Sequence, residues 1–278
     1  MGKFPCAAWK VGEHAMSERQ LLIDAGNTRV KWQLREGLAL RGEGALSLDA
    51  ASTLPKGPGV VFLSSVLRPD RESELLRAIK ALGWTLAYRA ASAHPFPGLA
   101  PGYREPARLG VDRWLALVAL RARGFLPAVT VDAGSALTID CLSPEGRHEG
   151  GWIVPGLTLA QRALFQGTDG VRGEGGWCWD AAQAPPRHTA AAVAQGVLQQ
   201  TMAFTAEVAQ QGAVRWGRPP TIVLTGGDGA ALLPGLRHRL PRHGIELEPR
   251  LVLEGLRALG EIHCDLSPDS LHSPSSPP

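Results

Sequence analysis

Short apolar runs and amphipathic segments alternate along the first ninety residues, and their order predicts an α/β protein. β-Branched and aromatic residues predict two strands within 21–35 and further strands over 59–67 and 84–90. Between the last two, segment 70–83 has apolar residues at helical spacing and ends at a glycine, which predicts an amphipathic helix. This order is typical of a mixed sheet with crossover helices.

The rest of the chain continues in the same manner, with strands and helices in alternation. The predicted elements are a helix over 110–124, a strand pair within 128–142, an apolar run at 149–157, a long Ala-rich helix over 188–211, a strand at 220–227 and a final helix over 251–262.

One short sequence motif occurs twice. Asp24 ends an apolar strand and begins D-A-G-N, and Asp132 ends another and begins D-A-G-S, 108 positions later (132 minus 24). That spacing equals the length of a domain, so we predict two structurally similar α/β halves with a cleft between them. The predicted boundaries are a disordered leader at 1–16, an N-terminal half at 17–125, a C-terminal half at 126–262 and a disordered Ser/Pro tail at 263–278.

Composition excludes several classes of function. The net charge is +3 and no block of basic residues or basic helix-turn-helix pattern occurs, so we expect no direct nucleic-acid partner. The sequence contains no run of 18 apolar residues, so no membrane span is predicted, and residues 1–15 lack the apolar core of a signal peptide. The four cysteines are scattered without zinc-site spacing. Unpaired thiols fit a reducing compartment, so we expect a cytoplasmic protein.

The first corner has the composition of a phosphate-binding turn. A glycine lets backbone N–H groups approach a phosphate, and neighbouring hydroxyl, amide and basic side chains add donors. A carboxylate beside such a cradle can hold hydrated Mg²⁺ that bridges nucleotide phosphates, which is the role expected of Asp24. A simple hairpin turn is the alternative for one copy taken alone. The candidate phosphate-binding residues of this corner are Asp24, Ala25, Gly26, Asn27, Thr28, Arg29, Val30 and Lys31.

The second corner, at Asp132 and Ser135, strengthens the phosphate interpretation because two such corners suit the two ends of a triphosphate. A strand also runs into Gly226 and Gly227, where a flat ligand such as adenine could lie against the backbone, or where the chain simply turns into a helix. Neither a G-x-G-x-x-G nor a G-x-x-x-x-G-K-[ST] motif occurs, which argues against Rossmann and P-loop folds.

At the start of the helix over 110–124, Asp112 and Arg113 place an acid beside a base. Asp112 could act as a general base for a hydroxyl nucleophile or as a plain helix N-cap, and Arg113 could clamp an anion. Tyr103 lies just upstream and could line the same pocket or serve packing alone.

Taken together and in order, these motifs resemble the type III pantothenate kinases, a family that also includes proteins named Bvg accessory factor. They are D-A-G-N-T, G-V-D-R-W, D-A-G-S-A-L-T-I-D, G-G-W-I-V-P-G, T-G-G-D and L-V-L-E-G-L, within residues 20–258. The resemblance implies two halves of the acetate and sugar kinase/Hsp70/actin (ribonuclease H-like) type. It also implies ATP-dependent phosphorylation of pantothenate to 4'-phosphopantothenate, the first step of coenzyme A biosynthesis.

The resemblance also implies roles for individual residues. Asp112 would accept the proton of the substrate hydroxyl, Asp132 would bind a monovalent cation (K⁺ or NH₄⁺), and Ser135 would contact ATP. Members of the family are homodimers, and Thr189 matches a threonine that reaches pantothenate across the dimer interface. The implied pantothenate-binding residues are Tyr103, Gly110, Val111, Asp112, Arg113 and Thr189.

The chain departs from the family pattern in a few places. Ser135 stands where the family mostly has threonine, which keeps the hydroxyl, and Pro-Gly precedes Tyr103 where Asn-x is commoner. Trp177 and Trp179 lie in a Gly-rich loop that suits packing at a dimer seam or a partner site. The alternatives to a pantothenate kinase are a regulatory protein acting indirectly on transcription and another phosphotransferase of the same fold with a sugar or acetate substrate.

Overall fold

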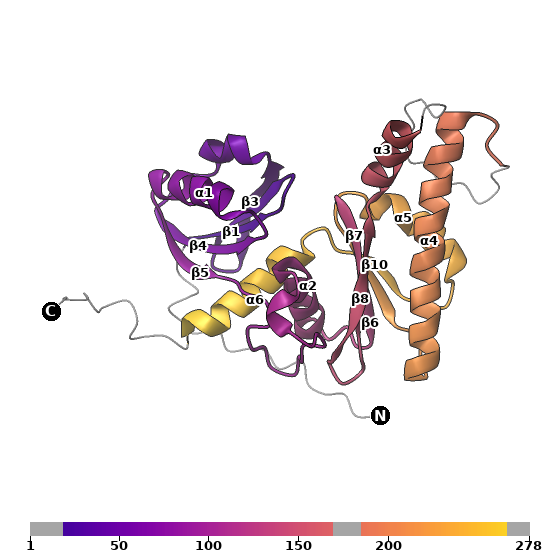
Figure 1. Cartoon of the computed structure of the whole chain (residues 1–278). Helices are drawn as coiled ribbons and strands as arrows, with labels where there is room; N and C mark the ends of the chain where they lie inside the picture. Colours follow the sequence, from indigo (N-terminus) through magenta and orange to yellow (C-terminus); the bar gives the residue numbers. More distant parts are fainter. Residues whose placement is uncertain (1–18, 169–184, 266–278) are drawn as a thin grey trace. The chain divides into compact units, whose positions relative to one another are not determined.

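The computed structural model describes residues 19–168 and 185–265. The predicted leader, the Trp177/Trp179 loop and the predicted tail beyond residue 265 lie outside these residues. The described chain divides into two compact units, whose elements are labelled in Figure 1. Among the described residues, no helix combines the length and the apolar character that crossing a membrane requires.

Unit 1 comprises the described residues up to Phe96, together with Ala107–Gly124 and those from Val252 onward. Its five-stranded sheet has the order β3-β2-β1-β4-β5. The strands are β1 (Arg19–Ala25), β2 (Val30–Glu36), β3 (Ala39–Leu46), β4 (Gly59–Ser65) and β5 (Trp84–Arg89). The helices are α1 (Pro69–Ala81), α2 (Val111–Ala122) and α6 (Leu251–Asp265), with a 3-10 turn at Leu48–Thr53.

The sheet of unit 1 is covered on both faces, which explains why its central strands are apolar without alternation. Ile23 and Leu63 on one face pack with Leu75 and Ile79, because α1 places these residues one turn apart on its buried side. On the other face, Phe62 lies against Gly260 of α6. Helices thus fix both central strands, β1 and β4, at whose ends the candidate residues begin.

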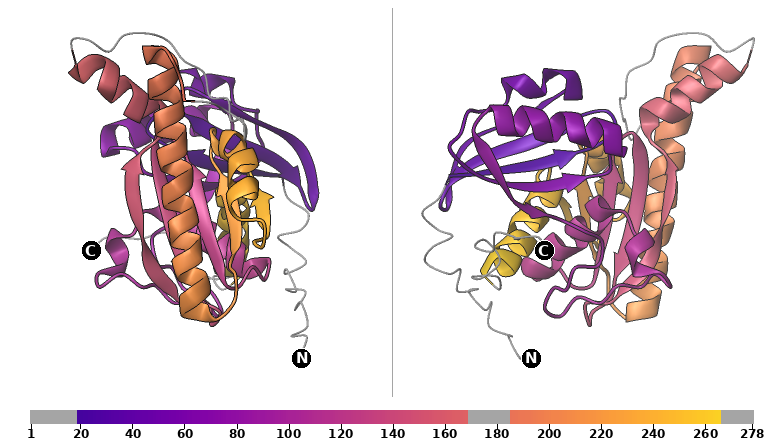
Figure 2. Two further views of the ribbon diagram at one scale, coloured as in Figure 1. Left: turned by 90° about the vertical axis from the view of Figure 1, so that its right-hand side faces the viewer. Right: turned by 60° about the vertical axis from the view of Figure 1, so that its left-hand side comes forward.

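Unit 2 comprises Pro97–Pro106 and Phe125–Leu251. Its sheet has the order β8-β7-β6-β9-β10. The strands are β6 (Ala128–Ala133), β7 (Ala136–Leu142), β8 (His148–Pro155), β9 (Thr221–Thr225) and β10 (Ile245–Leu247), and the helices are α3 (Leu157–Gly167), α4 (Thr189–Trp216) and α5 (Gly229–Arg239). A 3-10 turn at Pro106–Arg108 lies at the boundary between the units. Figure 2 shows α4 running along the sheet, with α3 beside its first turns.

The two sheets share one topology. In each, the first strand pairs antiparallel with the second and parallel with the fourth, and the remaining neighbours repeat the same directions. This arrangement confirms the predicted fold class, two similar α/β halves of the acetate and sugar kinase/Hsp70/actin type. Asp24 and Asp132 occupy the same position in the two sheets, one residue before the end of the first strand.

The units change between Gly124 and Phe125, one residue from the predicted boundary at 125, but they depart from the predicted halves in two other places. The final helix, α6, belongs almost entirely to unit 1, and residues 97–106 belong to unit 2. Gly255 of α6 lies so close to the carbonyl of Leu115 in α2 that a Cβ would overlap it, and Arg123 and Glu254 form an ion pair at 3.4 Å. These contacts between α2 and α6 explain why the final helix belongs to unit 1, although it follows the whole of the Phe125–Leu251 segment in the sequence.

Candidate functional site

The first corner is a tight turn between β1 and β2. The N–H of Gly26 donates to the carbonyl of Arg29 (3.0 Å), and a Cβ on Gly26 would come within 3.3 Å of that oxygen. Asn27, Thr28 and Arg29 are exposed at the tip, whereas Val30 returns to the core. The turn therefore presents donor side chains to solvent from a rigid base, as a phosphate cradle requires.

Asp24 lies between two strands that place polar side chains beside it. It pairs in register with Lys31 of β2 and with Ser64 of β4. Ser64 is fully buried, and its hydroxyl donates to Oδ1 of Asp24 at 3.1 Å. Because partners in register project from the same face of a sheet, the Lys31 ammonium group lies on the side of the Asp24 carboxylate. No local motif pointed to Ser64, whose role depends on strand register.

Asp112 is the second residue of α2 and only partly buried. Its Oδ1 accepts a hydrogen bond from the N–H of Arg113 at 2.8 Å, which satisfies one free donor of the first helical turn. A Cβ on Gly110 would lie 2.6 Å from the same oxygen, so any residue other than glycine at this position would displace the carboxylate. Arg113 itself is 5% exposed and Val111 is buried. The interpretation of Asp112 as the N-cap is wrong, because Gly110 is the N-cap residue of α2 and no side chain caps the helix. The role of Asp112 as a base stays a prediction.

The start of α2 is held at the edge of the sheet where β1 and β4 end. After β5, Ala90 donates to the carbonyl of Leu63 (2.8 Å), and the hydroxyl of Ser92 donates to the carbonyl of Leu109 just before α2. This edge also carries Asp24, because the carboxyl ends of parallel strands lie together. Unit 1 therefore gathers the first corner and Asp112 at one edge.

A partly buried cluster of Tyr88, His94 and His263, joined to Trp114 of α2, supports this placement. The indole N–H of Trp114 donates to the carbonyl of His94 at 3.1 Å. Burial lowers the pKa of His94, and the adjacent His263 lowers it further, while burial raises the pKa of the Tyr88 phenol. The Tyr88 hydroxyl therefore stays protonated, and it donates a hydrogen bond to Nδ1 of a neutral His94, 2.7 Å away.

The second corner lies at the N-termini of two helices of unit 2. The N–H of Gly156, before α3, donates to the carbonyl of Ser135 (3.2 Å), and the N–H of Asp228, before α5, donates to the carbonyl of Ala133 (2.9 Å). A Cβ on Gly156 would overlap the carbonyl of Gly134, so glycine is required for this contact. Helix N-termini favour anions, and the corner is therefore well suited to a phosphate.

Gly226, where the candidate adenine-binding turn begins, lies against the second corner. Its φ is +84°, and a Cβ would overlap the carbonyl of Ala133 and lie 2.5 Å from Oδ1 of Asp132. Asp132 also pairs in register with Thr225, whose hydroxyl is buried and has no hydrogen-bond partner among the described residues. Thr225 is the counterpart of Ser64 in the other sheet, yet only Ser64 donates to its aspartate. Gly227 is exposed.

The remaining candidates also lie in unit 2. Thr189 is the first residue of α4 and is exposed, and the His188 side chain before it caps the helix by accepting from the N–H of Ala191 at 3.4 Å. Tyr103 lies in the 97–106 segment with its ring stacked on that of His148. The candidate substrate residues are thus divided, with Gly110, Val111, Asp112 and Arg113 in unit 1 and Tyr103 and Thr189 in unit 2.

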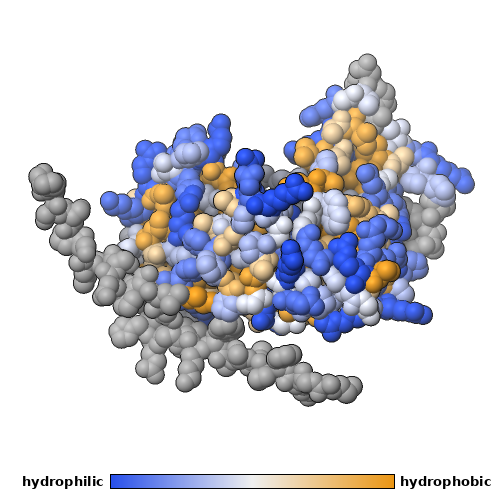
Figure 3. Space-filling model, turned by 60° about the horizontal axis from the view of Figure 1, so that its bottom comes forward, coloured by the Kyte–Doolittle hydropathy of each residue, from blue (hydrophilic) through white to orange (hydrophobic). Residues whose placement is uncertain are grey.

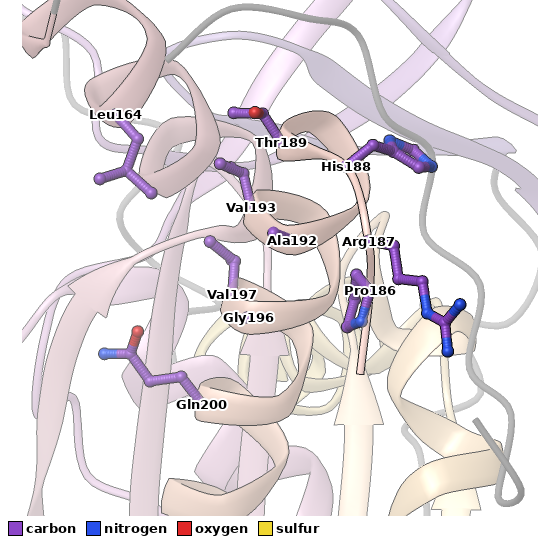
Figure 4. Close-up of a pocket in the computed structure, with 10 residues that line it drawn as sticks. All are labelled: Leu164, Pro186, Arg187, His188, Thr189, Ala192, Val193, Gly196, Val197 and Gln200. Atoms are coloured by element: carbon purple, nitrogen blue, oxygen red, sulfur yellow. The ribbon is translucent and has the colours of Figure 1, made fainter. Parts of the chain in front are cut away.

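Thr189 borders an open groove of about 750 Å³ between α3 and α4 (Figure 4). Leu164 of α3 and Val193 and Val197 of α4 line it, on the sides where the two helices face each other. Apolar side chains gather on the projecting part of unit 2 in Figure 3. The exposed apolar residues of α3 and the adjoining edge strand β8 are Trp152, Ile153, Leu159 and Leu164.

Residues 20–211 match the family model described as Type III pantothenate kinase. A protein of that name from Thiobacillus denitrificans is 38% identical over 246 residues, which cover 87% of this chain and 96% of the relative. Another from Laribacter hongkongensis is 36% identical, with 88% and 99% covered. A solved structure from Campylobacter jejuni, described as a Baf family transcriptional activator, aligns with a TM-score of 0.59 at 20% identity and covers 88% of this chain and 99% of its own, which shows a shared fold.

Proposed function

Because the chain belongs to the type III pantothenate kinase family, we propose that it transfers the γ-phosphoryl group of ATP to pantothenate and releases 4'-phosphopantothenate and ADP. The observation that supports this most is the pair of equivalent corners, each with an aspartate and a glycine turn at the end of the first strand of its sheet. Phosphoryl transfer depends on positioning and on neutralising charge, and the two corners offer donors for both.

Asp112 is the proposed proton acceptor. As the substrate hydroxyl oxygen forms its bond to the γ-phosphorus, the bond to the bridging oxygen of ADP breaks and the hydroxyl proton passes to the Asp112 carboxylate. One carboxylate oxygen already accepts from the Arg113 N–H, which fixes the orientation of the group. A loose transition state removes the proton late, so the acceptor need not be a strong base.

The remaining residues would bind and orient the two substrates. We assign the turn Asp24–Lys31, Ser135, Gly226 and Gly227 to ATP, and Tyr103, Gly110, Val111, Arg113 and Thr189 to pantothenate. Asp24, with the Ser64 hydroxyl beside it, offers the oxygen donors that Mg²⁺ prefers, so its carboxylate would hold the hydrated metal. When bound, Mg²⁺ neutralises phosphate charge.

The direct test is an assay of purified protein with ATP, Mg²⁺, K⁺ and pantothenate. We expect ADP release that depends on pantothenate, together with 4'-phosphopantothenate identified by mass spectrometry. ADP release that is the same with and without pantothenate, in K⁺ and in NH₄⁺, would exclude the proposed reaction. The kinase names of the curated relatives favour this activity over the regulatory alternative.

We also propose that Asp132 binds a monovalent cation, K⁺ or NH₄⁺, with Thr225 as a second oxygen ligand. The residues fit such an ion. A carboxylate and a hydroxyl are hard oxygen donors, and the Thr225 hydroxyl is 1% exposed without a hydrogen-bond partner among the described residues. A buried hydroxyl left without a partner costs free energy, so a ligand that accepts its lone pair would stabilise it.

Thr225→Val removes this hydroxyl while keeping the shape of the side chain. We expect the K⁺ concentration for half-maximal activity to rise by about tenfold, the effect of losing roughly 1.4 kcal/mol of ligand interaction. We also expect the rise in melting temperature on replacing Na⁺ by K⁺ to shrink, because an ion that binds the folded state stabilises it. Titration of activity and differential scanning fluorimetry measure the two effects.

Thr130→Val is the matched control. Thr130 is also buried on β6, its hydroxyl also lacks a partner among the described residues, and it precedes Asp132 by two positions. The K⁺ response should survive in this variant. An equal loss in both variants would place the ion elsewhere.

The α3–α4 groove supports a further part of the proposal, a homodimer formed by a second copy seated on this face. Leu164, Val193 and Val197 give the groove an apolar side, and further apolar side chains are exposed on α3 and β8. Exposed apolar side chains that gather on one face favour a protein partner. Thr189 lies at its border, where a partner's substrate site could be reached.

Leu164→Asp tests the dimer, because it places a charge in the groove. We expect a shift from dimer to monomer in sedimentation velocity at micromolar concentration, since an unpaired charge buried at an interface costs several kcal/mol, about 2–5. Leu38→Asp, at an exposed apolar residue in the β2–β3 turn of unit 1, should leave the dimer intact. A wild-type protein that sediments as a monomer would contradict the proposal.

A further inference from the structure

The segment 97–106, which carries Tyr103, is attached to the β7–β8 hairpin by its backbone. The N–H of Ala100 donates to the carbonyl of Gly146 (3.0 Å), and the N–H of His148 donates to the carbonyl of Ala100 (2.9 Å). Ala100 and Arg147 form an isolated parallel bridge. Although this segment connects elements of unit 1, it is therefore a structural part of unit 2.

His148 is the residue that this segment covers most closely. Gly102 passes so near the carbonyl of His148 that a Cβ would overlap it. The next residue, Tyr103, stacks its ring on the imidazole with 5.8 Å between ring centroids and 18° between planes. Gly102, immediately before Tyr103, thus permits the close approach to the His148 backbone next to which the two rings stack.

His148 is itself fixed by a buried carboxylate. The side chains of His148 and Asp140 are 0% and 1% exposed, and Nε2 lies 2.8 Å from Oδ1 of Asp140. Since a carboxylate only accepts hydrogen bonds, Nε2 carries the proton and donates. This hydrogen bond to a fixed strand residue holds the plane of the imidazole, while Nδ1 has no partner among the described residues.

From this geometry we propose that His148, oriented by Asp140, is a positioning residue for Tyr103 and thereby raises the affinity of the enzyme for pantothenate. The inference rests on the proposed function, in which Tyr103 contacts that substrate. His148 is enclosed and acts through Tyr103, so it is not a catalytic residue. A buried carboxylate and imidazole are costly compared with an apolar pair of similar volume, and a fixed platform for the substrate loop accounts for their presence.

His148→Gln removes the ring but keeps an amide donor for Asp140. We expect KM for pantothenate to rise about 3- to 10-fold, the range of a lost aromatic pair, while kcat and KM for ATP stay unchanged. Trypsin should also cleave after the exposed Arg104 faster, at temperatures equally far below the melting temperature of each protein, because the segment is less firmly held. Tyr103→Ala should raise KM similarly, and the double variant should be no worse than Tyr103→Ala alone.

A second pair of variants removes the buried charge altogether. Asp140→Leu/His148→Phe restores an aromatic platform, and Asp140→Leu/His148→Leu does not, so only the first should keep the wild-type KM for pantothenate. His243→Gln, the same change elsewhere in unit 2, should have no effect on KM.

The outcomes separate the two proposals. If Tyr103→Ala raises KM and neither His148→Gln nor the Leu/Leu variant does, the positioning role is wrong and the proposed function stands. If Tyr103→Ala itself leaves KM unchanged, the assignment of Tyr103 to pantothenate fails, and the role of His148 fails with it. If His148→Gln does not fold, the comparison of the Phe and Leu double variants decides.

Discussion

Asp112→Asn is expected to lower kcat by about 10²- to 10⁴-fold, the contribution of a positioned general base, while the protein stays folded. The amide cannot accept the hydroxyl proton, yet its oxygen can still accept the hydrogen bond that Arg113 donates to Oδ1. The first turn of α2 should therefore form as before. Steady-state kinetics with both substrates measure the loss of kcat, and circular dichroism and thermal melting measure whether the fold is retained.

Asp70→Asn is the matched control, because Asp70 occupies in α1 the position that Asp112 occupies in α2, the second residue of the helix. Its side chain is 63% exposed and forms a long ion pair with Arg68, at 3.6 Å. Activity should be unchanged. If Asp112→Asn kept a kcat near that of Asp70→Asn, the Asp112 carboxylate would serve only the first turn of α2, and the base would have to be sought elsewhere.

The repeated D-A-G motif was enough to predict two related halves, because it marks the same strand-to-turn transition at two places in the chain. In both sheets the motif ends the first strand and starts the corner to the second, which are features of neighbouring residues. The apolar runs over 59–67 and 220–227 likewise predicted β4 and β9. Local pattern thus identifies the strands that carry the candidate aspartates.

Three elements, β3, α3 and β10, have weak hydrophobic periodicity or low propensity, and the sequence did not predict them. β3 contains Gly42 and Gly44, which have low strand propensity, and it forms because the Trp32 ring of β2 packs over both glycines. α3 has few buried residues, and β10 is three residues long. Each depends on a neighbour in space for its stability, so tertiary context overrides local preference.

The side chains that contact the candidate residues could not be predicted from the sequence, for the same reason. Ser64 and Thr225 lie beside Asp24 and Asp132 only because β1 pairs with β4, and β6 with β9, in one particular register. His148 meets Tyr103 only because segment 97–106 joins unit 2. Strand register and the division into units are properties of long-range contacts, which no local pattern encodes.

Gly226→Ala is expected to destabilise unit 2 by about 2–4 kcal/mol, the sum of a left-handed backbone cost and an overpacked contact. At φ +84° an alanine is strained, and its Cβ would overlap the Ala133 carbonyl, which already accepts from Asp228. The same Cβ would lie 2.5 Å from Oδ1 of Asp132 and displace that carboxylate. Activity should therefore lose its K⁺ response under conditions where the variant is still folded. Urea denaturation and K⁺ titration measure the two effects.

Gly217→Ala separates the two causes. Gly217 follows α4 at φ +67° with open space where a methyl group would lie, so alanine there should cost only the backbone term, roughly 1 kcal/mol, and leave the K⁺ response intact. A difference between the variants then measures the contact of residue 226 with the second corner. If the two alanines destabilised the protein equally and both kept the K⁺ response, the close approach of Gly226 to Asp132 would contribute nothing to stability, and the turn at Gly226 and Gly227 would act independently of the cation site.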